Sequence, residues 1–299
     1  MSATRLRTAL VDRVAAQWTA MGVALQAPAE RTVVDLEALI GLTATVGADD
    51  ARVWRGAVAW CGRHGRFVNN ARLRRVVTEM ALAGDDLAEF VIAARRAGAP
   101  PWLAAGPASR SAGDRAALDD LVVLRPTRDA SRLLWHLRAT FGVNARADIV
   151  ANLVARPGSS LTVLEMAHLT RFTKRNAAVA LEDLRLAGVV ERQGGGTLGR
   201  FRLRDPGGLL RWFEQPDAVS YPDWVAQFTV GLAVLAFLEV PAQSERVRAI
   251  EARQIATVLR PAIERATLPG PDLRVTGPAF TGAFDTWVEQ LARRWEAPA

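Results

Sequence analysis

The order of elements within residues 144–204 constrains the fold of this chain more than any other feature. Three short helical patterns come first, and two strand-like runs follow them, joined through Gly194, Gly195 and Gly196. Chains with this order form a compact unit in which the third helix and the two-stranded hairpin lie on one side. Lys174, the only lysine among the 299 residues, falls at the start of that third helix.

Local signals mark where the helices of this unit begin. Thr162 and Glu165 have the spacing of a capping box, and Leu161 and Met166 stand where a hydrophobic staple would pack. Thr173 is expected to cap the third helix in the same way. The inward positions of that helix recur at helical spacing and are Ala177, Ala180, Leu181 and Leu184.

These inward positions determine which residues face outward on helix 173–187. Lys174, Arg175, Ala178 and Glu182 are expected on the opposite side, with Asn176 and Val179 at the margins. The hairpin is predicted from two runs, Val189–Gln193 and Leu198–Leu203. Because side chains alternate along a strand, one face of the second run carries Arg200, Arg202 and Arg204.

The run from Leu164 through Leu203, in which LEDLRLAGVVER leads into a glycine-rich wing, resembles the MarR and ArsR types of winged helix-turn-helix transcriptional regulators. The resemblance covers about sixty residues, a fifth of the chain. It implies a protein that binds palindromic DNA operators as a homodimer. Two features differ from these families: the metal-ligating cysteines of the ArsR type are absent, and Gly194-Gly195-Gly196-Thr197 replaces the acid–arginine wing tip of the MarR type.

We therefore predict that helix 173–187 enters the major groove of DNA, while the wing 190–203 contacts the backbone or the minor groove. Arginine and lysine donate to guanine, asparagine pairs with adenine, and an alanine methyl contacts a thymine methyl. Arginines on a hairpin reach phosphates. The predicted DNA contacts are Arg171, Thr173, Lys174, Arg175, Asn176, Ala178, Arg192, Thr197, Arg200 and Arg202.

The rest of the chain is predicted to be helical. Apolar residues recur at helical spacing near 3–25, 34–46, 49–64, 70–82, 85–97, 129–141, 208–215, 222–239, 243–266 and 277–296. The expected fold class is mainly α: a multi-helical protein with a central winged helix-turn-helix that carries one small β-hairpin. We divide it into an N-terminal helical domain (1–125), the winged helix-turn-helix domain (126–205) and a C-terminal helical domain (206–299).

The distribution of charge favours an anionic partner for the central segment. Residues 1–143 carry a net charge of +5, residues 144–204 also carry +5 within a much shorter length, and residues 205–299 carry −3. Arginine supplies all but one of the basic residues, as GC-rich bacterial coding produces, so arginine counts alone are weak evidence. The arginine-rich segment from Arg52 to Arg75 is either a second nucleic-acid surface or a solvated face over an aromatic core.

Several function classes are not supported by the sequence. Cys61 is the only cysteine, the three histidines are scattered, and no nucleophile elbow, P-loop or dinucleotide fingerprint occurs, so we expect neither metal, cofactor nor enzymatic activity. The pair Asp35 and Glu37 falls at a predicted helix start, where acids are favoured by the helix dipole. The apolar run Trp224–Leu238 is shorter than the roughly twenty residues that span a bilayer, so we predict a buried helix and a cytoplasmic protein.

Two alternatives remain open from the sequence. The winged unit could dock protein instead of DNA, which would make the chain an interaction scaffold or an antitoxin-like subunit. The C-terminal helices, which carry Val247, Ile250 and Val258, could form the homodimer interface or bury one another within a monomer. The sequence indicates no particular effector, whether small molecule or protein.

Overall fold

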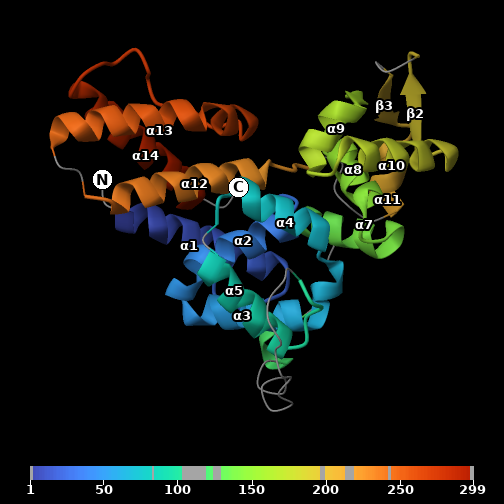
Figure 1. Cartoon of the computed structure of the whole chain (residues 1–299). Helices are drawn as coiled ribbons and strands as arrows, with labels where there is room; N and C mark the ends of the chain where they lie inside the picture. Colours follow the sequence, from blue (N-terminus) through green and yellow to red (C-terminus); the bar gives the residue numbers. More distant parts are fainter. Residues whose placement is uncertain are drawn as a thin grey trace.

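The computed structural model describes residues 3–82, 84–102, 119–123, 129–195, 199–212, 219–241 and 244–296. It is mainly helical with one small antiparallel sheet of three strands, which confirms the mainly α class (Figure 1). The prediction of a two-stranded hairpin was incomplete, because a third strand pairs with it. Thr197 lies outside the described residues.

Helices from the N-terminal part of the chain pack around α2, which is buried along almost its whole length. They are α1 (Ala3–Ala20), α2 (Leu36–Val46), α3 (Ala51–His64), α4 (Asn70–Glu79) and α5 (Gly84–Arg96), with the short 3-10 helices η1 (Gly47–Asp49), η2 (Gly65–Phe67) and η3 (Asp119–Leu121). Side-chain caps at Asp35, Asp50 and Asn69 begin α2, α3 and α4. The first helix ends at Ala20, earlier than predicted, because Gly22 turns the chain with a φ of 94° and Val23 then forms a β-bridge with Val122.

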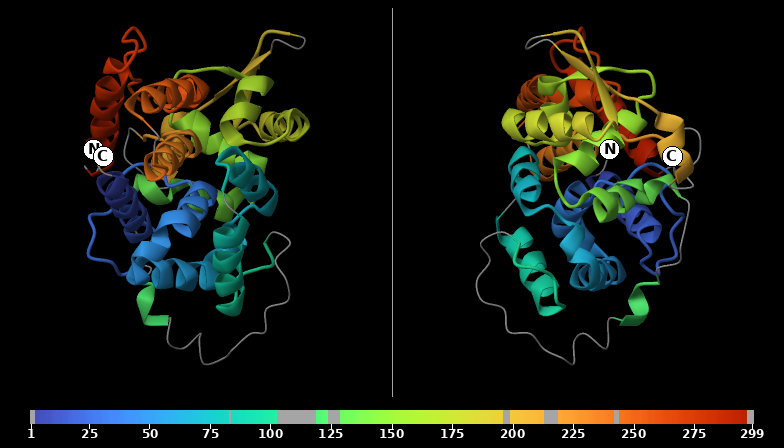
Figure 2. Two further views of the ribbon diagram at one scale, coloured as in Figure 1. Left: turned by 60° about the vertical axis from the view of Figure 1, so that its left-hand side comes forward. Right: turned by 90° about the vertical axis from the view of Figure 1, so that its right-hand side faces the viewer.

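The two ends of the chain pack together. The C-terminal helices are α11 (Pro206–Trp212), α12 (Trp224–Glu239), α13 (Glu245–Arg265) and α14 (Ala279–Glu296). Helix α1 packs against both α12 and α14, and Arg5 at its start pairs with Glu296 at 2.9 Å (Figures 1 and 2). One hydrophobic core contains residues of all three predicted segments, so the core does not mark where one domain ends and the next begins. The domain boundaries at 125 and 205 stay a prediction.

Helix α12 is the apolar segment for which the sequence predicted burial. Trp224, Phe228 and Leu235 are buried in it, and Asp223 caps its start by accepting a hydrogen bond from the amide of Ala226. Among the described residues, no helix combines the length and the hydropathy that crossing a membrane requires. The prediction of a buried core helix is therefore confirmed.

The central segment consists of four α-helices and the sheet. After the 3-10 turn η4 (Ala130–Arg132) come α7 (Leu133–Phe141), α8 (Ala145–Val154), β1 (Leu161–Thr162), α9 (Val163–Thr170), α10 (Lys174–Leu186), β2 (Val190–Gln193) and β3 (Arg200–Leu203). The strand order is β1-β3-β2, with Leu161 opposite Phe201. The predicted capping box between Thr162 and Glu165 is present, since each residue's side chain accepts from the other's backbone amide.

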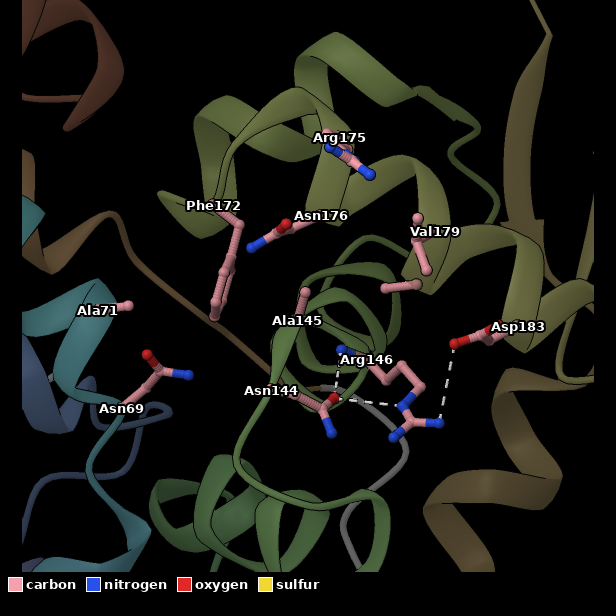
Figure 3. Close-up of a pocket in the computed structure, with 11 residues that line it drawn as sticks. Asn69, Ala71, Asn144, Ala145, Arg146, Phe172, Arg175, Asn176, Val179 and Asp183 are labelled. Atoms are coloured by element: carbon pink, nitrogen blue, oxygen red, sulfur yellow. Dashed lines mark hydrogen bonds and ion pairs between the residues drawn. The ribbon is translucent and has the colours of Figure 1, made fainter.

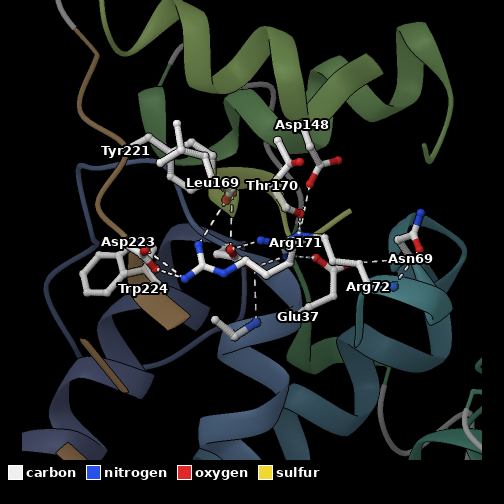
Figure 4. Close-up of polar contacts among 12 residues, drawn as sticks. Glu37, Asn69, Arg72, Asp148, Leu169, Thr170, Arg171, Tyr221, Asp223 and Trp224 are labelled. Carbon is white, nitrogen blue, oxygen red and sulfur yellow. Dashed lines mark hydrogen bonds and ion pairs between the residues drawn. The ribbon is translucent and has the colours of Figure 1, made fainter. Parts of the chain in front are cut away.

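A buried network of charges joins this segment to the N-terminal helices (Figure 4). Its members are two arginines and three carboxylates, all at most 4% exposed: Arg72, Arg138, Asp35, Glu37 and Asp148. Arg72 on α4 donates to Asp35 and Glu37, both at 2.6 Å. Arg138 on α7 donates to Glu37 at 2.7 Å and to Asp148 on α8 at 2.9 Å. The network therefore ties α2 and α4 to α7 and α8.

The carboxylates of this network respond in opposite ways to their surroundings. Burial alone would raise the pKa of Asp35, but the charge and hydrogen bonds of Arg72 outweigh burial and lower that pKa to about 2. Burial raises the pKa of Asp148, and the two arginines only partly offset this. Arg72 also donates from Nε to the carbonyl of Thr170 at 2.9 Å, so the network reaches the end of α9.

We predict that Arg138→Met lowers the free energy of unfolding by about 3–5 kcal/mol, because Glu37 and Asp148 would stay buried with a charge left uncompensated. Urea denaturation followed by circular dichroism measures the change. Arg260→Ala, which removes an exposed ion pair with Glu264 on α13, is the control and should cost less than about 1 kcal/mol. Equal stability of the two variants would contradict a stabilising role of the network.

Candidate nucleic-acid interface

Helix α10 presents the residues that the sequence selected as its outward face. Thr173 caps the helix, since its Oγ1 accepts a hydrogen bond from the amide of Asn176 at 3.1 Å. The four predicted inward residues are buried, which confirms the assignment of the helix faces. The predicted DNA contacts of this helix are all exposed, namely Thr173, Lys174, Arg175, Asn176 and Ala178.

Arg171, in contrast, is buried and paired with carboxylates, which contradicts its prediction as an exposed DNA contact. Its side chain is only 8% exposed and forms ion pairs with Asp223 at 2.7 Å (Figure 4) and with Glu79 at 3.2 Å. Arg171 adopts the left-handed conformation, with a φ of 57°, and its carbonyl accepts from Arg75 at 2.7 Å. The residue anchors the turn between α9 and α10 to α4 and α12.

The arginines of the hairpin are exposed, but carboxylates accompany two of them. Arg200 pairs with Glu165 at 3.3 Å and also donates from Nε to the carbonyl of Ser160 at 3.0 Å. Arg202 pairs with Glu191 across the strands at 2.5 Å. Exposed ion pairs of this kind contribute about 0–1 kcal/mol, so a phosphate can replace the carboxylate at small cost. Arg192 stacks over the ring of Phe201, with 5.7 Å to its centre.

A groove borders α10 on the side of α4 and α8 (Figure 3). It has a volume of about 350 Å³. Phe172, Val179 and Ala71 supply apolar lining, and the polar groups at its edges include Arg175, Asn176 and Arg146. Sequence reasoning selected Arg175 and Asn176 but missed Arg146, because the approach of α8 and α4 to α10 depends on tertiary packing and leaves no local signal.

Part of the arginine-rich segment from Arg52 to Arg75 makes contacts within the protein. Arg72 is buried in the charge network, Arg75 binds the carbonyl of Arg171, and Arg63 donates to the carbonyl of Val122 at 3.1 Å. Several of these arginines therefore hold the fold together. This arrangement favours the structural interpretation of the segment over a second nucleic-acid surface.

The described residues contain no group of three or more His, Cys, Asp or Glu side chains placed to hold a metal ion. His64 is buried against Trp60, with 5.3 Å between the ring centres. Burial, with the nearby charges of Arg63 and Arg66, lowers the pKa of His64 to about 4.

Comparison with known proteins found no match to this chain, whether among protein-family models, curated proteins or solved structures.

We predict that Arg171→Met lowers the free energy of unfolding by about 2–4 kcal/mol, because Glu79 and Asp223 would lose the cation that compensates them. Arg175→Met, which makes the same change at an exposed position four residues further on, is the matched control and should stay within about 0.5 kcal/mol of the parent. Thermal and urea unfolding of both variants measure the difference. An Arg171 variant as stable as the Arg175 variant would show that the anchor is dispensable.

Proposed function

We propose that the chain is a sequence-specific DNA-binding transcriptional regulator whose winged helix-turn-helix comprises α8, α9, α10 and the three-stranded sheet. The observation that carries the proposal is the exposed start of α10, from Thr173 to Ala178, next to a hairpin with exposed arginines. The sheet order β1-β3-β2, with β1 placed before α9, suits such a unit.

The chemistry of α10 suits the reading of bases. The first turn of the second helix in a helix-turn-helix faces base edges in the major groove. Lys174 and Arg175 can donate to guanine, Asn176 can pair with adenine, and the methyl of Ala178 can contact thymine. Arg192, Arg200 and Arg202 on the hairpin would contact phosphates or the minor groove and so set the orientation of the helix.

We further propose that the regulator acts as a homodimer through α13. Ile250 and Val258 on this helix are 60% and 71% exposed, and they lie two turns apart on one face around Gln254. Exposed apolar side chains that form a contiguous patch mark interaction surfaces. If α13 pairs antiparallel with its own copy, Ile250 of one protomer would meet Val258 of its partner.

A second candidate function, protein docking by the same unit, rests on a specific observation. Val179 and Leu186 on α10 are 56% and 72% exposed, and Leu164 on α9 is 51% exposed. Exposed aliphatic residues suit a protein partner better than a phosphate backbone. This alternative corresponds to an interaction scaffold or antitoxin-like subunit.

Fluorescence anisotropy with a labelled duplex from the region upstream of the protein's own gene, compared with a scrambled duplex, separates the two functions. DNA reading predicts preference for the native duplex. It also predicts a slope of about −5 for log affinity against log salt, given roughly six phosphate contacts.

Lys174→Ala and Arg175→Ala should each reduce that preference, at a cost of about 1–3 kcal/mol for each lost base contact. Arg274→Ala, which removes an exposed positive charge between α13 and α14, is the control and should keep it. Equal binding of both duplexes by the parent protein would favour protein docking.

A further inference from the structure

The groove beside α10 brings together residues that are distant in the sequence. Asn69 and Ala71 at the start of α4 line one side, while Arg146 in the first turn of α8 and Asp183 on α10 lie across from them (Figure 3). Arg175 and Asn176, which the proposed function assigns to base reading, also line it. The groove therefore continues the proposed DNA surface beyond the winged unit, onto the N-terminal helices.

The position of the groove relative to the hairpin gives it a defined place in a complex. In Figure 1 the hairpin of β2 and β3 rises on one side of α10, and α7 and α4 lie on the other side. An α-helix with its side chains is about 10–12 Å wide. The major groove of DNA is about 12 Å wide, so a helix inside it is flanked by a phosphate backbone on both sides. The hairpin can meet only one of these two backbones.

We propose that the groove between α10, α8 and α4 receives the second phosphate backbone, and that Arg146 is the residue that binds its phosphates. This inference rests on the proposed function, because it requires α10 to lie in the major groove. It adds a contact on the flank opposite to the hairpin, which the arginines of β2 and β3 cannot supply.

The ion pair that Arg146 forms with Asp183 is weak enough for a phosphate to replace the carboxylate. The Nη1 of Arg146 lies 3.8 Å from Asp183, and the two side chains are 43% and 48% exposed. Its Nε donates to the side chain of Asn144 at 3.3 Å, and both residues line the groove. A phosphate accepts two parallel hydrogen bonds from a guanidinium and so forms a stronger pair than a distant carboxylate. Asp183 then opposes DNA by repelling the phosphate and by holding Arg146.

The chain offers a matched control for both members of this pair. Asp272 and Arg274, between α13 and α14, form an exposed ion pair at 2.9 Å. Arg146→Ala and Arg274→Ala change the net charge equally, as do Asp183→Asn and Asp272→Asn. Any difference within each pair of variants therefore reports the position of the charge and not its sign.

The test measures the affinity of the full chain for the native and the scrambled duplex over a series of salt concentrations. Arg146→Ala is expected to weaken binding to both duplexes about 3- to 10-fold and to reduce the magnitude of the salt slope by about 0.9, since one phosphate contact is lost. Asp183→Asn is expected to tighten binding to both duplexes about 2- to 5-fold, as the loss of a like charge near the phosphate requires. Arg274→Ala and Asp272→Asn should change neither affinity nor slope.

The possible failures are distinguishable. If the parent prefers its native duplex and Lys174→Ala reduces that preference, but the Arg146 and Asp183 variants match their Arg274 and Asp272 controls, the groove assignment is wrong and the proposed function stands. A loss confined to the native duplex in Arg146→Ala would mean that Arg146 contacts bases, which also overturns the backbone assignment. If the parent shows no preference between the duplexes, both proposals fail.

Discussion

The buried pairing of two arginines with three carboxylates is the constraint on which the arrangement of the whole molecule depends. Removing these charges from water is costly, and their burial is tolerable because each of them is paired and hydrogen-bonded. Arg72 and Arg138 must therefore reach Asp35, Glu37 and Asp148 at the same time. Because these residues come from α2, α4, α7 and α8, the position of α8 is fixed relative to the N-terminal helices. Helix α10 packs on α8, so its exposed face is fixed as well.

A second set of charges fixes the turn before α10 to the C-terminal helices. Glu79 on α4 accepts from Arg171 in this turn and from Arg265 at the end of α13, while Asp223 at the start of α12 also holds Arg171. The outer face of α13 therefore has a set position relative to α10. If two copies pair through α13, the distance between their α10 helices follows from the fold, and with it the spacing of the two DNA half-sites. The proposed dimer would therefore have a fixed half-site spacing, which a flexibly tethered DNA-binding unit would not have.

The sequence was sufficient wherever the determining signal was local. The capping box of Thr162 and Glu165, the cap at Thr173 and the spacing of the apolar residues in α10 each lie within one or two helical turns, and the structure has all of them. Strand β1 was missed because it has only two residues, and its pairing with β3 bridges forty positions. Arg171 was assigned to the surface because its partners Glu79 and Asp223 are 92 and 52 residues away. The sequence alone does not distinguish an arginine that neutralises a distant carboxylate from one that faces a ligand.

The exposed cations around α10 differ in whether a carboxylate lies close to them, and this difference affects the specificity of the proposed DNA binding. Arg146, Arg200 and Arg202 each have a carboxylate within ion-pair distance. In the described part of the chain, Lys174 and Arg175 form no such pair. A cation that must give up a carboxylate gains less from a phosphate than a free cation does, which in the proposed complex would limit the sequence-independent share of DNA affinity. The two cations at the start of α10 meet no such competition, so a larger part of the binding energy of the proposed complex would depend on the base edges that they meet. An arginine-rich regulator of this kind would thereby remain selective among DNA sequences although its net charge attracts all of them.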